Sequence, residues 1–150
     1  MKITVITIGH KFETFEEEWI EVYQKRLKHY VSADWIRLNP KKKFSDEDLI
    51  SEIEKKSQSG SQIVLLDESG KSMNTKEIKT WIEKLEVQSQ SHICFVIGES
   101  HGFSQALLNK FPFHLSLSKL TFPHKLAMLV LFEQLYRVYS WKAGSPYHHN

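Results

Sequence analysis

The stretch that decides the fold class is Ile93–Gly98, ICFVIG, the most apolar short run of the chain. Five consecutive apolar residues closed by a glycine are typical of a strand that is buried on both faces, as the central strands of parallel sheets are. We therefore expect residues 93–97 to form a central strand. The single cysteine, Cys94, lies inside this run, which excludes an intramolecular disulfide and favours a buried thiol over a nucleophile.

Strand candidates and helix candidates alternate on both sides of this run. Further strands are expected at residues 3–8, 33–38, 62–66 and 114–117. Helix starts are predicted from capping residues at Thr14, Ser45, Asn74 and Ser104, and a last helix from about residue 122 to 141. The polar residues Asp67–Gly70 are expected to form a turn. This alternation predicts a single α/β domain over residues 1–150, with a mostly parallel sheet and helices on both faces.

The composition limits the possible classes of protein. The chain has 150 residues, of which 41% are hydrophobic and 25% charged, as in an ordinary globular domain. Its formal charge of +2 neither demands nor excludes a polyanionic partner, and phosphate contacts are credible only at two basic stretches, Gln24–His29 and Pro40–Lys43. No signal peptide and no membrane-spanning run is visible, so we expect a soluble, cytoplasmic protein with no membrane partner.

Three loops follow predicted strand ends, at residues 67–71, 98–102 and 118–124. Ligands of open α/β sheets bind outside the carboxyl ends of the strands, so these loops are expected to meet at one pocket. Gly98 and Gly102 would let the backbone approach a ligand, although two glycines after a strand also occur in plain turns. The stretch GESHG is not a GxGxxG motif, and it lacks the Lys-Ser/Thr pair of a phosphate-binding loop.

The last predicted helix is apolar around most of its circumference, so it must be covered by its own domain or by another subunit. We expect a homodimer. Glu133 and Arg137 stand four residues apart on this helix, either as an exposed ion pair or facing a polar site. His124 at its start is either structural or part of such a site.

The carboxyl-terminal residues Tyr147, His148 and His149 form a polar aromatic tail. The tail could stack on a base, bind a metal or be disordered. No cysteine or carboxylate with ligand spacing accompanies these histidines, so no metal site is expected.

Six segments resemble, in order and spacing, the RlmH family of SPOUT-class methyltransferases. They are MKITVITIGHKF (1–12), LLDESGK (65–71), FVIGESHGFS (95–104), LSLSKLTFPH (115–124), EQLYR (133–137) and PYHHN (146–150). The resemblance implies an enzyme that uses S-adenosylmethionine to methylate N3 of a pseudouridine in large-subunit (23S) ribosomal RNA, on the assembled ribosome. It also implies an α/β fold with a carboxyl-terminal trefoil knot, and a homodimer whose composite site uses both subunits.

The same resemblance assigns residues to the site. The cofactor pocket it implies consists of Leu66, Gly98, Gly102, Leu117, Ser118, Lys119, Leu120, Thr121 and Phe122. The implied catalytic group contains His148 and His124 as candidates for proton handling, Tyr147 beside the target nucleotide, and Arg137 as an anchor for phosphate or carboxylate. The tail would act at the pocket of the partner subunit.

The chain departs from the family pattern at three places. Glu99 stands where a glycine is usual, Met128 where an arginine is common, and His149 and Asn150 follow the PYH motif where a basic residue is common. The first two changes leave a second interpretation open: a catalytically impaired homologue of the same fold that binds RNA or the ribosome.

Overall fold

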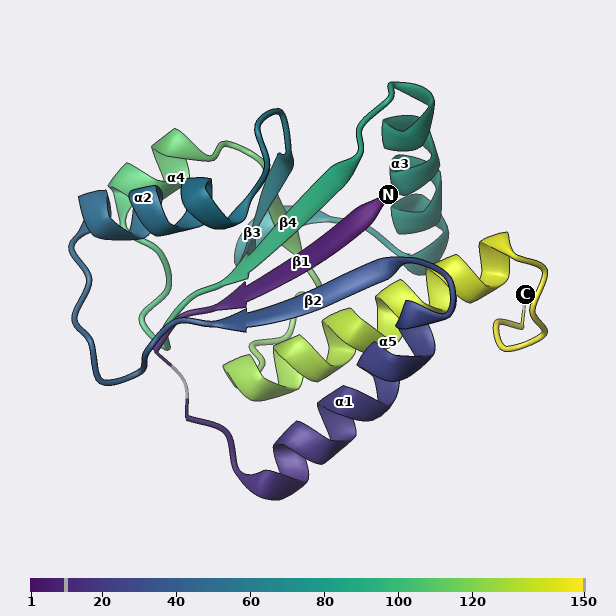
Figure 1. Cartoon of the computed structure of the whole chain (residues 1–150), viewed down its shortest axis with the longest axis horizontal. Helices are drawn as coiled ribbons and strands as arrows, with labels where there is room; N and C mark the ends of the chain where they lie inside the picture. Colours follow the sequence, from purple (N-terminus) through teal and green to yellow (C-terminus); the bar gives the residue numbers. More distant parts are fainter. Residues whose placement is uncertain (10, 150) are drawn as a thin grey trace.

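The computed structural model describes residues 1–9 and 11–149 and shows a parallel sheet between two layers of helices (Figure 1). The strands are β1 (Lys2–Thr7), β2 (Ser32–Arg37), β3 (Gln62–Ser72), β4 (His92–Ile97) and β5 (His114–Ser116). The helices are α1 (Thr14–Lys28), α2 (Asp46–Lys56), α3 (Thr75–Val87), α4 (Gln105–Lys110) and α5 (His124–Lys142). The strand order is β2-β1-β4-β3-β5, and every neighbouring pair is parallel. Strand β4, which contains the ICFVI run, is therefore the central strand, and all its residues are buried.

Both faces of the sheet are covered, as the sequence predicts. Ile93, Phe95 and Ile97 point to one face and pack in a hydrophobic core with residues of α1, α3 and α5. Cys94 and Val96 point to the other face and pack with residues of α2 and α4. Figure 1 shows these two helical layers on opposite sides of the strands. Burial raises the pKa of the Cys94 thiol to about 12, which suits a side chain that packs and does not react.

Capping residues set most of the helix starts where the sequence places them. The side chains of Ser45, Asn74 and Ser104 each accept a hydrogen bond from a backbone N–H in the first turn of their helix. Helix α1 is different, because its cap is Glu13 and not the predicted Thr14. The backbone N–H of Glu13 donates to Oε1 of Glu16 at 2.8 Å. The capping box is therefore formed by Glu13 and Glu16, one residue earlier than the predicted pair Thr14 and Glu17.

The turn predicted at Asp67–Gly70 is wrong, because β3 continues through these residues to Ser72. Leu115 of β5 pairs with both Leu66 and Lys71, so residues 67–70 form a bulge between two paired segments. A β-carbon on Gly70 would lie 2.6 Å from the carbonyl carbon of His114, and glycine is needed for this close approach.

Helix α5 packs against α1 and α3 beneath the sheet. Its buried apolar side chains recur at helical spacing, and they are Met128, Leu131, Phe132, Leu135, Val138 and Tyr139. None of the helices in the described part of the chain is long and apolar enough to cross a bilayer.

Candidate functional site

A cavity of about 780 Å³ lies at the carboxyl ends of β4 and β5, beside the bulge of β3. The three loops that the sequence places at strand ends all contribute to its lining, through residues 66–68, 97–103, 117–118 and 120–125. All residues predicted for the cofactor pocket line this cavity except Lys119. Pockets for small molecules have volumes of roughly 300–1,000 Å³, so the cavity is large enough for a ligand such as a nucleoside derivative.

The cavity wall combines apolar side chains with carboxylates. The apolar part comes from Leu66, Ile97, Leu115, Leu117, Leu120, Phe103 and Phe122. The carboxylates are Asp67 and Glu68 on the β3 bulge and Glu99 after β4. Sequence reasoning assigned no role to Asp67 or Glu68, because it treated residues 67–70 as a turn, although it placed that loop at the pocket. Such a wall suits a ligand with both a flat apolar part and positive charge.

Hydrogen bonds hold the loop between β5 and α5 against the β3 bulge. The Oγ of Ser116 donates to the carbonyl of Ser118 at 2.8 Å, and the Oγ of Ser118 accepts from the N–H of Leu120 at 2.9 Å. The Thr121 hydroxyl then donates to Oε2 of Glu68 at 2.9 Å. These bonds preorganise the loop that forms one side of the cavity.

His124 fixes the start of α5 to the end of β4. Its Nδ1 donates to the carbonyl of Gly98 at 2.6 Å, and both residues line the cavity. The neutral ring therefore carries its proton on Nδ1, and Nε2 is the acceptor nitrogen. A β-carbon on Gly98 would lie 3.0 Å from the ring of Phe103, so a larger residue at position 98 would displace this ring, which forms part of the cavity wall.

Glu99, the first departure from the family pattern, packs along the cavity wall. Its carboxylate lies against Gly9 and 3.5 Å from Nε2 of His101. Its backbone carbonyl accepts from the N–H of Gly102 at 2.9 Å, which closes the turn that holds this part of the wall. The side chain borders the cavity without crowding out the space that the loops enclose.

Met128, the second departure, does not face the cavity. Its side chain is 0% exposed and packs in the core beneath the sheet. In this chain position 128 therefore belongs to the core and is not part of the cavity lining. Position 128 has the same helical phase as Leu131, Phe132 and Leu135, and this spacing in the sequence could have shown it.

Arg137, Tyr147 and His148 lie together at the far end of α5. Arg137 donates from Nη2 to Oε1 of Glu133 at 2.6 Å, the Tyr147 hydroxyl donates to the same oxygen at 3.0 Å, and Arg137 Nη1 lies 3.3 Å from Nδ1 of His148. His148 also stacks on Trp141, with ring centroids 4.2 Å apart.

The charges in this cluster are mutually satisfied. The Glu133 hydrogen bond raises the pKa of Arg137, and burial, with help from Glu133, raises the pKa of Tyr147. Tyr147 is therefore a neutral hydrogen-bond donor at physiological pH. The Nδ1 lone pair of His148 accepts from Arg137, so it is already engaged in this conformation.

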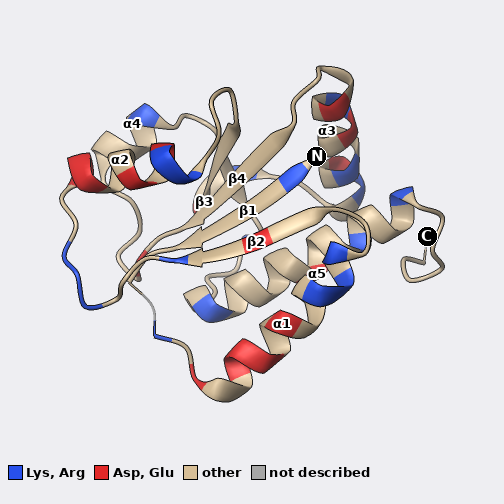
Figure 2. Cartoon of the chain, in the orientation of Figure 1, with Lys and Arg blue, Asp and Glu red and all other residues tan. Residues whose placement is uncertain are grey.

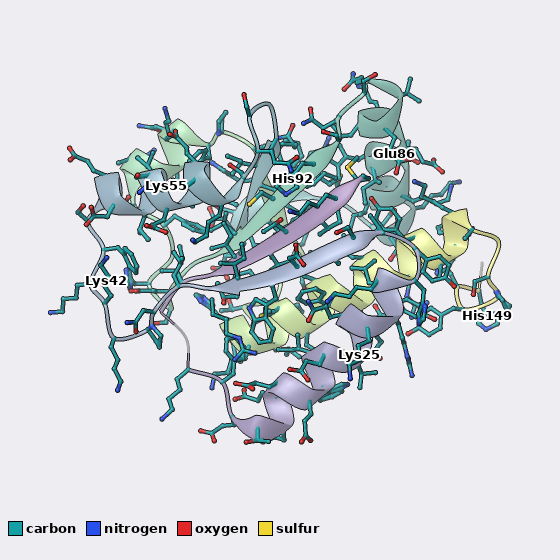
Figure 3. All side chains as sticks on the ribbon, in the orientation of Figure 1. Lys25, Lys42, Lys55, Glu86, His92 and His149 are labelled. Carbon is teal, nitrogen blue, oxygen red and sulfur yellow. The ribbon has the colours of Figure 1, made fainter. Side chains whose placement is uncertain are left out.

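Within one chain three of the four predicted catalytic residues lie together, and His124 lies apart from them. His124 lies in the cavity, whereas Arg137 is 13 residues further along α5, or about 20 Å at 1.5 Å per residue. Figure 3 shows the tail residue His149 at one end of the long axis and Lys42, on the cavity side, at the other. Asn150 lies outside the described residues. No group of three or more His, Cys, Asp or Glu in residues 1–9 and 11–149 is arranged to hold a metal ion.

Comparisons with known proteins point to one family. The model of the family described as "Predicted SPOUT methyltransferase" matches residues 1–148. A protein of Acetivibrio thermocellus named "Ribosomal RNA large subunit methyltransferase H" is 35% identical over 99% of both chains, and one of the same name from Clostridium novyi is 36% identical over 99% of both. The solved structure of the SpoU methyltransferase AviRb from Streptomyces viridochromogenes, in complex with the cofactor AdoMet, superposes with a TM-score of 0.51 at 11% identity, over 96% of this chain and 59% of that one.

Proposed function

The chain belongs to the SPOUT methyltransferase family, and we propose that it uses S-adenosylmethionine to methylate N3 of a pseudouridine in the 23S RNA of the assembled ribosome. The names of its full-length relatives support a ribosomal RNA of the large subunit as the substrate. The main support for the proposal is the cavity, because the three loops predicted to hold the cofactor all line it. A protein of the same fold solved with AdoMet supports the cofactor.

The residues present fit this cofactor. The adenine would lie among the apolar side chains of Leu66, Leu117 and Phe122, held by backbone groups of the loops that end at Gly98 and begin at Leu117. S-adenosylmethionine, when bound, supplies an electrophilic methyl group on a sulfonium cation. The carboxylates of Asp67, Glu68 and Glu99 give the cavity a negative wall that favours a cationic ligand.

The protein must hold the base in line and help N3 lose its proton. His124 lines the cavity and its Nδ1 donates to the carbonyl of Gly98, so proton transfer by the neutral ring would involve Nε2. Tyr147 and Arg137 present a neutral hydroxyl and a permanent cation, which suit a base edge and a phosphate. Proton handling by His148 would first require it to leave Arg137.

The separation of His124 and Arg137 along α5 argues for a composite site made by two subunits. Helix α1 exposes a stripe of large apolar side chains, with Phe15 at 68% and Trp19 at 56% exposure and Val22 further along the helix, and Tyr30 is exposed just after it. A second copy of the chain would cover such a stripe. In this homodimer the tail of each subunit acts at the cavity of the other. The trefoil knot implied by the resemblance stays a prediction.

The test is methyl transfer to ribosomes that lack the modification. Purified protein is incubated with isotopically labelled S-adenosylmethionine and either joined ribosomes or free large subunits, and the nucleosides of the digested RNA are identified by mass spectrometry. We expect label in N3-methylpseudouridine, and more with joined ribosomes. Label in another nucleoside would overturn the proposed substrate. Cofactor and ribosome binding without transfer would establish the impaired homologue instead.

A further inference from the structure

We propose that the loop between β2 and α2, residues 39–44, is a docking surface for the phosphate backbone of the RNA substrate. The inference rests on the proposed function and adds to it the place where RNA is held next to the cavity. The loop carries three consecutive exposed lysines, Lys41, Lys42 and Lys43. Figure 2 shows it as a basic segment projecting beyond the carboxyl ends of the strands.

The backbone of this loop is fixed, and the lysine side chains are available. Leu38 donates to the carbonyl of Thr7, and the side-chain and backbone oxygens of Asn39 accept from the N–H groups of Lys41 and Lys42 at 3.0 and 3.1 Å. This turn directs the lysines outward, and in Figure 3 Lys42 extends away from the body of the molecule. Within the described chain no ion pair involves any of the three ammonium groups. Lys42 Nζ lies 5.1 Å from the centre of the Phe44 ring, and binding of an external anion by the three lysines breaks no ion pair of the described residues.

A second cavity joins the loop to the proposed active site. It has a volume of about 290 Å³, and Phe44 at the base of the loop lines it together with Ile8 at the end of β1. Its opposite wall is formed by Gly98, Glu99, His101, Gly102 and Phe103, which also line the first cavity. The second cavity lies between the carboxyl ends of β1 and β4, where the strand order reverses and open α/β sheets bind ligands. RNA held by the lysines would therefore lie next to the second cavity, which shares a wall with the cofactor cavity.

The neighbouring acidic residues at the start of α2 are held by hydrogen bonds of their own. Asp48 accepts from the backbone N–H of Ser45 at 3.3 Å as part of the helix cap. Asp46 accepts from the hydroxyl of Ser104 at 2.8 Å, which turns its carboxylate towards α4. Both carboxylates keep their negative charge, as does Glu47, but among the described residues no ion pair joins any of the three to the lysines of the loop.

The other basic stretch, Gln24–His29, is less suited to this role within one chain. It forms the end of α1, just before β2 begins, and so lies at the amino edge of the sheet. The loop of three lysines is the basic stretch that shares an edge of the sheet with both cavities.

Phosphate contacts have a recognisable signature, because each releases bound counterions. The logarithm of the affinity falls with the logarithm of the salt concentration, with a slope of about 0.7 for each phosphate of single-stranded RNA and about 0.9 in a duplex. Three lysine contacts would contribute roughly 2 to the slope. A loop that acted only in folding would leave this slope unchanged.

The experiment compares the variant K41Q/K42Q/K43Q with a control, K55Q/K76Q/K84Q, which removes three exposed lysines from α2 and α3. Binding to unmodified ribosomes and the KM for methylation are measured from low to physiological salt, alongside S-adenosylmethionine affinity and thermal unfolding. For the loop variant we expect a ribosome affinity at least about a hundredfold weaker at low salt and a salt slope reduced by about 2. Cofactor affinity, kcat and unfolding should match the wild type, and the control should keep the wild-type slope.

Two results would overturn the inference. One is a loop variant whose ribosome affinity and salt slope equal those of the control. The other is a weaker affinity with an unchanged slope, which would assign the loop to a contact other than phosphate. If the wild type binds ribosomes but transfers no methyl group, the proposed function fails, whereas the binding slopes still decide the role of the loop.

Discussion

The side chain of Glu99 occupies the space that a β-carbon on Gly9 would need. An ideal β-carbon there would lie 2.6 Å from Oε1 and 2.7 Å from Cγ of Glu99, closer than such atoms approach. Gly9 also has a φ of +72°, a conformation that residues with a β-carbon rarely adopt. The packing of Glu99 in the cavity wall therefore requires a glycine at position 9, just after β1.

Replacing Gly9 by alanine should destabilise the protein by at least about 1 kcal/mol, from the left-handed conformation alone. The contact with Glu99 adds to this cost. In the double variant G9A/E99A the contact is gone and only the conformational cost remains, so the two changes should couple by about 0.5–3 kcal/mol. Urea unfolding of the wild type, both single variants and the double variant measures the coupling. Strict additivity would show that Glu99 moves aside freely.

Glu99 should also tune the ligand that the cavity prefers. S-adenosylmethionine carries a sulfonium charge that its product S-adenosylhomocysteine lacks, and Glu99 is one of the carboxylates in the wall. The variant E99Q should weaken binding of the cofactor relative to the product by up to about fivefold, since a solvated charge contributes about 1 kcal/mol at close range. Calorimetric titrations with both ligands test this. An equal loss for both would mean that Glu99 acts through the shape of the wall.

The variant M128R should lose stability and gain no activity. The Met128 side chain is fully buried, so an arginine there would place an unpaired guanidinium in the core at a cost of more than about 3 kcal/mol. The control M128L keeps the volume and should cost less than about 1.5 kcal/mol. Thermal unfolding and methyl transfer are measured for both. Higher activity of M128R would show that the position faces the site in the working enzyme.

Local patterns in the sequence predicted the architecture. The ICFVI run predicted β4 at the centre of the sheet, and the caps at Ser45 and Asn74 predicted two helix starts, because each depends on residues within a few positions. The meeting of the strand-end loops followed from the general behaviour of parallel sheets.

Features that depend on distant residues were not predicted. The bulge at 67–70 exists because Leu115 pairs on both sides of it, and the packing of Glu99 on Gly9 joins segments 90 positions apart. Residue types alone do not specify either contact. The individual site residues were predicted from the family resemblance. The alternation of strands and helices supported only the three loops at strand ends.

His92 should make stability depend on pH. Its ring is 1% exposed, Nδ1 accepts from the N–H of Gln58 at 3.2 Å, and Nε2 lies 2.8 Å from the hydroxyl of Thr4. Burial lowers the pKa of His92, with a further contribution from Lys2, while Asp34 acts in the opposite direction. The folded state therefore keeps this ring neutral.

The unfolded chain binds the proton first as the pH falls below about 6.5, so the contribution of His92 to stability is complete above that pH and is lost below it. The loss approaches about 1.4 kcal/mol per pH unit between the unfolded and folded pKa values. Urea unfolding from pH 5 to 8 should show a steeper fall for the wild type than for H92Q. Parallel curves would mean that His92 is not the group that titrates.

Mixing two inactive variants tests whether the site uses both subunits. T121W fills the cavity of its own subunit, and a chain truncated after Pro146 lacks the tail with Tyr147 and His148. Each homodimer has only defective sites. If the tail of one subunit serves the cavity of the other, a mixed dimer contains one complete site, because the intact tail of T121W meets the intact cavity of the truncated chain.

After denaturation and refolding together in equal amounts, half of the dimers should be mixed, and methyl transfer should recover to about a quarter of the wild-type rate. Refolding each variant alone is the control and should give no recovery. The 13-residue separation of His124 and Arg137 on one rigid helix is the reason to expect this result, since neither can reach the other within a chain. Stable mixed dimers without activity would place the complete site inside one subunit and require the tail to fold back along α5.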